Sequence, residues 1–209
     1  MYNRIKKIES GSFILSDQPE KSLQNLYSQN SWKSKFKPVI ETIEMIAMAL
    51  VLYFLIDSVV ARVRVQKISM EPTLVPGEVL LVNKLAYTFS DIERGNIITF
   101  HYPIEPDLDY VKRVIGKPGD EVIVRNGNVW VNNQVLFEPY ISAAPEYEGV
   151  WAVPEDALFV LGDNRNPSAD SHVWGFVPLE NVIGKAFAVY WPPNKIRGLS
   201  TPDVFAAGQ

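Results

Sequence analysis

The stretch Ser69-Met70-Glu71-Pro72-Thr73-Leu74 marks the point where this 209-residue chain changes from one kind of sequence to another. The only long apolar segment lies just before it, and short β-rich runs flank and follow it. Taken alone, a serine before a methionine and a Pro-Thr pair usually ends a strand or caps a turn. The stretch therefore predicts a boundary between one N-terminal apolar helix and a mostly β, antiparallel domain.

The composition is that of a globular protein, with 47% hydrophobic and 21% charged residues. A net charge of −4 argues against nucleic acid as the main partner. The absence of cysteine excludes disulfides, thiolate metal sites and a cysteine nucleophile. With two distant histidines and no carboxylate–histidine spacing, we expect no metal and no cofactor.

Residues 1–37 are polar and carry seven basic residues, so we predict a loosely ordered cytoplasmic arm. Pro38 can open a helix, and we predict a transmembrane helix over residues 38–61. Its apolar residues contribute about −3 to −6 kcal/mol towards insertion, which offsets a single aspartate costing about 2.5 to 3.5 kcal/mol. A buried core helix is the alternative.

Lys33, Lys35 and Lys37 before this segment favour a cytoplasmic N-terminus under the positive-inside rule, although basic residues also follow it. Residues 62–209 are then predicted to form an extracytoplasmic β-rich catalytic domain.

Short β-rich runs separated by turn residues follow the apolar segment. The clearest is a hairpin over Glu121–Val131, in which Asn126-Gly127 is a type I′ turn signal. Two Pro-rich stretches, Tyr102–Asp109 and Glu138–Asp156, are expected to be long loops or a small inserted lobe. A small lobe is expected around residues 120–157, and the tail after Pro202 is expected to fray. The other predicted strands are Val63–Ile68, Val79–Val82, Ile97–His101, Tyr110–Ile115, Ala157–Leu161 and Lys185–Trp191.

Lys112 shares a strand face with Tyr110 and Val114, because side chains two residues apart point to the same side. Such a face can desolvate an ammonium and lower its pKa from about 10.4 by as much as about 3 to 5 units. A lysine of that kind is a usable general base. The alternative is a surface lysine whose stem lies along the sheet.

Gly162–Ser171 is dense in turn formers and follows an apolar strand directly. It can be a tight polar loop held by Asx turns and an Arg165–carboxylate pair. It can equally serve a site, since the Ser168 hydroxyl is able to accept a hydrogen bond from a lysine amine and fix its direction.

Taken together, Ser69–Leu74, Tyr110–Asp120 and Gly162–Ser171 resemble the three ordered motifs of type I signal peptidases. These are membrane-bound Ser-Lys endoproteases that remove signal peptides from exported preproteins. The resemblance covers about residues 63–192, and residues 170–178 look most like the cyanobacterial and thylakoid branch.

The resemblance implies a role for each matching residue. Ser69 matches the nucleophile, Lys112 the general base and Ser168 the serine that orients the lysine. Met70 is expected near the substrate groove. The residues expected to shape the site without performing chemistry are Asp163, Arg165 and Asp170. The implied partners are signal-peptide-bearing preproteins and the lipid bilayer, and cleavage is expected after small-x-small sites.

Three positions depart from the family pattern. Lys67 stands two before Ser69, where many relatives carry a serine or glycine that completes the oxyanion hole. Residues two apart on a strand share a face, so Lys67 could reach towards the site. We expect it instead to turn outward to lipid headgroups, with a backbone group or water replacing the missing hydroxyl. His172 replaces a common arginine, so that an ion pair with Asp170 becomes pH-dependent. Asn96 replaces an aspartate, which we expect to be minor.

Three other functions remain open from the residues alone. A Ser-His-Asp triad has only His101 or His172 to use. A self-cleaving repressor-type protease shares the Ser-Lys pair but would carry a DNA-binding module before it. A non-catalytic, membrane-anchored β domain could bind exported peptides without cutting them.

Overall fold

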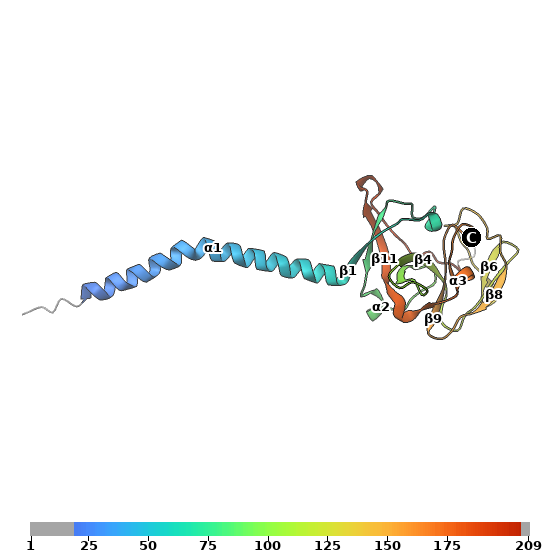
Figure 1. Cartoon of the computed structure of the whole chain (residues 1–209), viewed down its shortest axis with the longest axis horizontal. Coiled ribbons are helices and arrows are strands. Elements are labelled where there is room, and N and C mark those ends of the chain that lie inside the picture. Colours follow the sequence, from blue (N-terminus) through green and yellow to red (C-terminus); the bar gives the residue numbers. More distant parts are fainter. Residues whose placement is uncertain (1–18, 206–209) are drawn as a thin grey trace, which may run out of the picture. The chain divides into compact units, whose positions relative to one another are not determined.

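The computed structural model describes residues 19–205 (Figure 1). The chain divides into two compact units, Met1–Tyr53 and Phe54–Gln209. A long helix, α1 (Pro19–Val59), supplies the described part of the first unit and runs on into the second. The second unit is otherwise built from short strands.

Helix α1 contains Pro38 in its interior, so the prediction that the helix begins there is wrong. Residues 19–37, expected to be a loose arm, are helical, and residues 1–18 lie outside the described residues. An internal proline removes one backbone donor at a cost of about 3 kcal/mol, which the long helix tolerates. Within the described residues, one helical segment, Phe36–Val59, has the length and hydropathy needed to cross a membrane. None of its most apolar window is buried, which does not fit a core helix.

The second unit contains two antiparallel sheets, as the sequence predicted. The larger sheet has the order β1-β2-β11-β3-β4-β9-β10, with β12 paired to β11. Its strands are β1 (Val60–Arg64), β2 (Val79–Asn83), β3 (Ile97–His101), β4 (Asp109–Gly116), β9 (Ala157–Leu161), β10 (Val177–Pro178), β11 (Val182–Trp191) and β12 (Arg197–Gly198).

The smaller sheet has the order β7-β6-β5-β8 and lies within residues 120–157, a segment called the lobe below. Its strands are β5 (Glu121–Arg125), β6 (Asn128–Val131), β7 (Gln134–Val135) and β8 (Gly149–Ala152). Asn126 and Gly127 both have positive φ between β5 and β6, so the type I′ hairpin is confirmed. Strand β8 was expected to be loop, because four residues give too short a pattern to recognise without their partner strand β5.

Short helical turns connect these strands: η1 (Ile68–Met70), α2 (Ala86–Phe89), α3 (Ser171–Trp174), η2 (Leu179–Asn181) and η3 (Pro193–Lys195). The predicted strand Val63–Ile68 is displaced, since β1 ends at Arg64 and η1 begins at Ile68.

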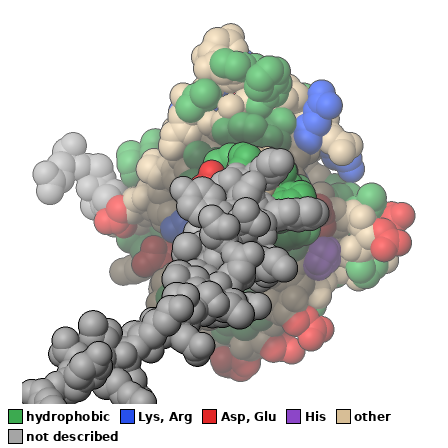
Figure 2. All heavy atoms as spheres, turned by 90° about the vertical axis from the view of Figure 1, so that its left-hand side faces the viewer, with side chains coloured by type: hydrophobic (Ala, Val, Ile, Leu, Met, Phe, Trp, Pro, Cys, Tyr) green, Lys and Arg blue, Asp and Glu red, His purple; other side chains and the backbone are tan. Residues whose placement is uncertain are grey.

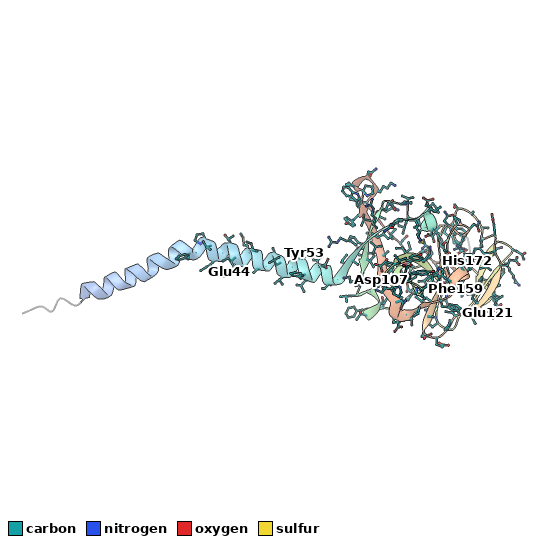
Figure 3. The ribbon with its side chains drawn as sticks, in the orientation of Figure 1. Glu44, Tyr53, Asp107, Glu121, Phe159 and His172 are labelled. Atoms are coloured by element: carbon teal, nitrogen blue, oxygen red, sulfur yellow. The ribbon has the colours of Figure 1, made fainter. Side chains whose placement is uncertain are left out.

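Three apolar clusters form the interior of this unit. One lies between the lobe and the large sheet and includes Phe159, which Figure 3 shows inside the domain, and Val204. The Val204 carbonyl also accepts a hydrogen bond from the Phe137 amide (2.9 Å), so the tail packs as far as Phe205 instead of fraying. A second cluster includes Met70 and Leu74, and a third contains Phe100 and Val114. Figure 2 shows hydrophobic side chains gathered in the upper part of one face, with Asp and Glu side chains at its lower edge.

Candidate active site

A groove of about 800 Å³ runs along the second unit and brings Ser69 and Lys112 to one place. It is lined by residues 62–70, residues 107–112, Pro167 and Ala169. One wall runs from the end of β1 into η1, and the other runs from the loop before β4 into the first half of that strand. Asp107, labelled in Figure 3, belongs to the second wall.

Ser69 lies in the single turn of η1 and is held by the loop that begins at Gly162. The Asn164 amide donates to the Ser69 carbonyl (3.1 Å), and Asn164 Nδ2 donates to the Ile68 carbonyl (3.1 Å). Gly162 lies so close to Ser168 and the Ser69 carbonyl that a methyl group there would overlap both. The absence of a side chain at Gly162 thus allows the loop to pack directly against Ser69.

Lys112 is a buried lysine on β4, with 3% of its surface exposed. This burial rules out the surface-lysine alternative. Its Nζ donates to Ser168 Oγ (3.1 Å), which is also buried. Burial lowers the pKa of Lys112 to about 8, and the nearby Lys67 charge acts in the same direction, whereas Asp170 and Asp163 oppose it. A large fraction of Lys112 is therefore neutral in mildly alkaline solution.

Asp163 is fully buried and forms a bidentate ion pair with Arg113 (2.8 and 2.7 Å). Arg113 follows Lys112 on β4, donates to the Gly95 carbonyl (2.8 Å) and lies over the ring of Tyr140 (3.9 Å to the centroid). The pair ties the loop to the strand that carries Lys112. Sequence reasoning missed Arg113, because nothing local marks a strand arginine as buried.

Arg165 forms a second bidentate pair, with Glu138 of the lobe (2.7 and 2.5 Å). Its Nε also donates to the Gly162 carbonyl (3.1 Å). Asn166 adds two bonds to the lobe, through the Ala144 carbonyl (3.1 Å) and the Glu146 amide (2.9 Å). The lobe therefore clamps the loop that holds Ser168. The Arg165–carboxylate pair offered from the sequence is present, and its partner is Glu138, which local patterns did not identify.

Asp170 is fully buried and accepts hydrogen bonds from the Gly162 amide (2.9 Å) and the His172 amide (3.3 Å). Its Oδ1 lies 2.5 Å from His172 Nδ1, so the expected Asp170–His172 contact is present. The His172 ring stacks on Tyr147 (3.8 Å between centroids). The other histidine, His101, faces Asp109 (3.0 Å). Each imidazole thus has a carboxylate partner of its own.

Two expectations about the rim of the groove need correction or refinement. Lys67 does not turn outward: its Nζ donates to the Tyr110 hydroxyl (3.3 Å) and lies 4.9 Å from the centre of that ring. Met70 lines the groove but is 2% exposed and packs in the core, so it can offer only a small surface.

Asn96, the third departure from the family pattern, is buried. It accepts a hydrogen bond from the Tyr87 hydroxyl (3.1 Å) and donates one to Thr201 Oγ1 (2.9 Å), which is a structural role.

Within residues 19–205, no three side chains of His, Cys, Asp or Glu come together as metal ligands would. The groove is lined by a serine with its hydroxyl and by a lysine with a buried amine, which together suit nucleophilic acyl transfer.

Comparison with known proteins identifies the class. Residues 39–191 match the family described as signal peptidase, peptidase S26, and the chain belongs to that family. The predicted enzyme class and the antiparallel fold are confirmed.

Particular relatives agree with the predicted branch. Signal peptidase I of Leptolyngbya laminosa is 43% identical over 178 residues, covering 80% of this chain and 87% of the relative. Probable signal peptidase I-2 of Synechocystis sp. is 42% identical over 191 residues, covering 86% and 87%. Thylakoidal processing peptidase 1, chloroplastic, of Arabidopsis thaliana is 33% identical over 205 residues, covering 92% of this chain and 60% of the relative. The resemblance to the cyanobacterial and thylakoid branch is confirmed.

Proposed function

We propose that this protein is a membrane-bound serine endopeptidase that removes N-terminal signal peptides from exported preproteins after small-x-small sites. Membership of the signal peptidase family supports signal-peptide removal. The Ser69–Lys112 dyad is supported above all by one observation. The amine of Lys112, a residue with 3% of its surface exposed, donates to Ser168 in the groove that Ser69 lines.

Acylation begins when neutral Lys112 takes the proton from Ser69 Oγ, and that oxygen attacks the carbonyl carbon of the scissile peptide. The backbone N–H of Ser69 stabilises the resulting oxyanion, and one such donor is worth about 3 to 4 kcal/mol of barrier. The C–N bond then breaks, and the Lys112 ammonium gives its proton to the leaving amine. The signal peptide is left as an ester on Ser69.

Deacylation uses the same amine in the same role. Neutral Lys112 takes a proton from a water molecule as the water attacks the ester, and the ammonium returns that proton to Ser69 Oγ as the C–O bond breaks. The products are a signal peptide with a free carboxylate and the regenerated enzyme.

The lowered pKa of Lys112 is what makes this role effective near neutral pH. With a pKa of about 8, about one Lys112 in ten is neutral at pH 7. At the ordinary value of 10.5, about one in three thousand would be. Ser168 accepts from the amine and fixes its direction, while Asp163, Arg165 and Asp170 hold the loop that presents Ser168.

We further propose that Phe36–Val59 spans the bilayer with the N-terminus in the cytoplasm and the β-rich unit on the trans side. The length and hydropathy of the segment support a span. Large exposed apolar side chains on the second unit, such as Phe89 and Ile196, suit a domain that works beside a membrane.

The test is cleavage of a preprotein with an Ala-x-Ala site by the detergent-solubilised full chain. The parent is expected to cut after the second alanine, and Ser69→Ala is expected to be folded and inactive. Ser90→Ala serves as the matched control, because that serine is exposed and lies outside the groove. Replacing the second alanine by a bulky residue should abolish cutting, and equal cleavage of both substrates would contradict the predicted specificity.

A further inference from the structure

Lys67 stands at the entrance to the η1 turn, two residues before Ser69, and is the extended residue that caps that turn. It lines the same groove as Ser69 and Lys112. An exposed lysine ordinarily extends its strongly hydrated ammonium into water. Here the ammonium instead contacts both the hydroxyl and the ring of Tyr110 across the groove.

The platform under Lys67 is itself held in place. Tyr110 stacks face to face on Tyr102 (4.4 Å between centroids, 8° between planes) and meets Phe100 edge to face (6.4 Å, 67°). A cation above an aromatic ring is attracted by the negative face of the ring. Tyr110 precedes Lys112 by two residues on β4, so the two side chains lie on the same face of the strand. Tyr110 thus holds the Lys67 ammonium in the groove that Lys112 also lines.

The charges that act on Lys112 come from several elements. Asp163 and Asp170, from the loop that follows β9, favour the protonated form of Lys112. Both are engaged elsewhere, Asp163 with Arg113 and Asp170 with His172. Lys67 acts in the opposite direction, since a second positive charge disfavours the ammonium form.

We propose that Lys67 is a positioning residue of the active site: held on Tyr110, its ammonium favours the neutral form of Lys112 and so extends cleavage to lower pH. This role rests on the proposed function, because it requires Lys112 to act as the base. This role also depends on the charge of Lys67, which a serine or glycine at the same position would not supply.

The experiment compares kcat/KM for an Ala-x-Ala preprotein from about pH 6 to about pH 10 in the full-length parent, Lys67→Met and Lys67→Arg. Lys67→Met removes one positive charge near Lys112, so the acidic limb of its pH profile should move to higher pH by about 0.5 pH unit. Its kcat/KM at pH 7 should then fall about threefold and recover to the parent value on the alkaline plateau. Lys67→Arg keeps the charge and should keep the position of the limb.

Two controls separate this inference from the proposed function. Arg125 also lies over an aromatic ring (5.2 Å from Trp130), but in the lobe and outside the groove, so Arg125→Met should leave the limb unmoved. If the parent cuts and Ser69→Ala does not, but Lys67→Met has the limb of the parent or an equal loss at every pH, this inference is wrong and the proposed function stands. If the parent does not cut at all, both are wrong.

Discussion

The burial of Lys112 should be visible as a pH-dependent cost to stability. The pKa falls from 10.5 to about 8 on folding, mainly by burial, so the unfolded chain binds more protons than the folded one between these values. The contribution of Lys112 to the free energy of unfolding therefore rises with pH between about 8 and 10.5. Below about pH 8 the group is charged in both states and the full penalty of burying the charge is present, which corresponds to about 3 kcal/mol.

Replacing Lys112 by methionine, a side chain of similar length without a charge, should remove that penalty. We expect Lys112→Met to be more stable than the parent at pH 7 by up to about 3 kcal/mol. The advantage should disappear as the pH rises towards about 10.5, because the parent lysine is then neutral in both states.

Guanidinium unfolding of the full chain in mild detergent, followed by tryptophan fluorescence at several pH values, measures the difference. Lys185→Met, which removes a lysine from β11, is the matched control. A Lys112→Met advantage that is the same at pH 7 and pH 10.5 would refute the claim that burial lowers the pKa of Lys112.

Three further changes test the support around the amine. Ser168→Ala removes the acceptor that holds Lys112 (3.1 Å), so kcat should fall about 10- to 100-fold with little change in KM in steady-state assays. Gly162→Ala places a methyl group against Ser168, and both activity and thermal stability should fall, whereas Gly198→Ala, in open space, should behave as the parent. Glu138→Ala leaves the buried Arg165 guanidinium without its carboxylate, and chemical unfolding should show a loss of about 3 to 5 kcal/mol.

Each of these has an outcome that would count against the reasoning. A Ser168→Ala enzyme with unchanged kcat would mean that Lys112 needs no orienting partner. Equal behaviour of the two glycine variants would mean that the close approach of the loop at Gly162 is unimportant. A Glu138→Ala chain as stable as the parent would mean that the lobe does not clamp the loop.

The sequence predicted those parts of the fold that depend on local patterns of residues. The strands at Ile97–His101 and Ala157–Leu161 have the predicted bounds, because short apolar runs between turn residues adopt few structures other than a strand. The hairpin at Asn126-Gly127 was predictable for the same reason, since its turn requires two residues that tolerate positive φ. The predicted start of the helix at Pro38 was wrong, because proline is favourable at a helix start but is only unfavourable, not excluded, in a helix interior.

The parts of the site that could not be predicted depend on contacts between distant segments. Glu138 reaches Arg165 from the loop that follows β7, and Arg113 meets Asp163 across fifty residues. Nothing in the local sequence distinguishes either residue from an exposed charge. Lys67 was expected to turn outward to lipid headgroups, and only the placement of Tyr110 across the groove shows where its ammonium lies.

The most direct test of the Ser69–Lys112 mechanism is acid-quench mass spectrometry during turnover of an Ala-x-Ala preprotein. In the parent, we expect the peptide containing Ser69 to carry the mass of the signal peptide as an ester. In Lys112→Met, folded and bound to the same preprotein, we expect no such adduct. An adduct on another residue, or one that forms as quickly in Lys112→Met as in the parent, would contradict the mechanism.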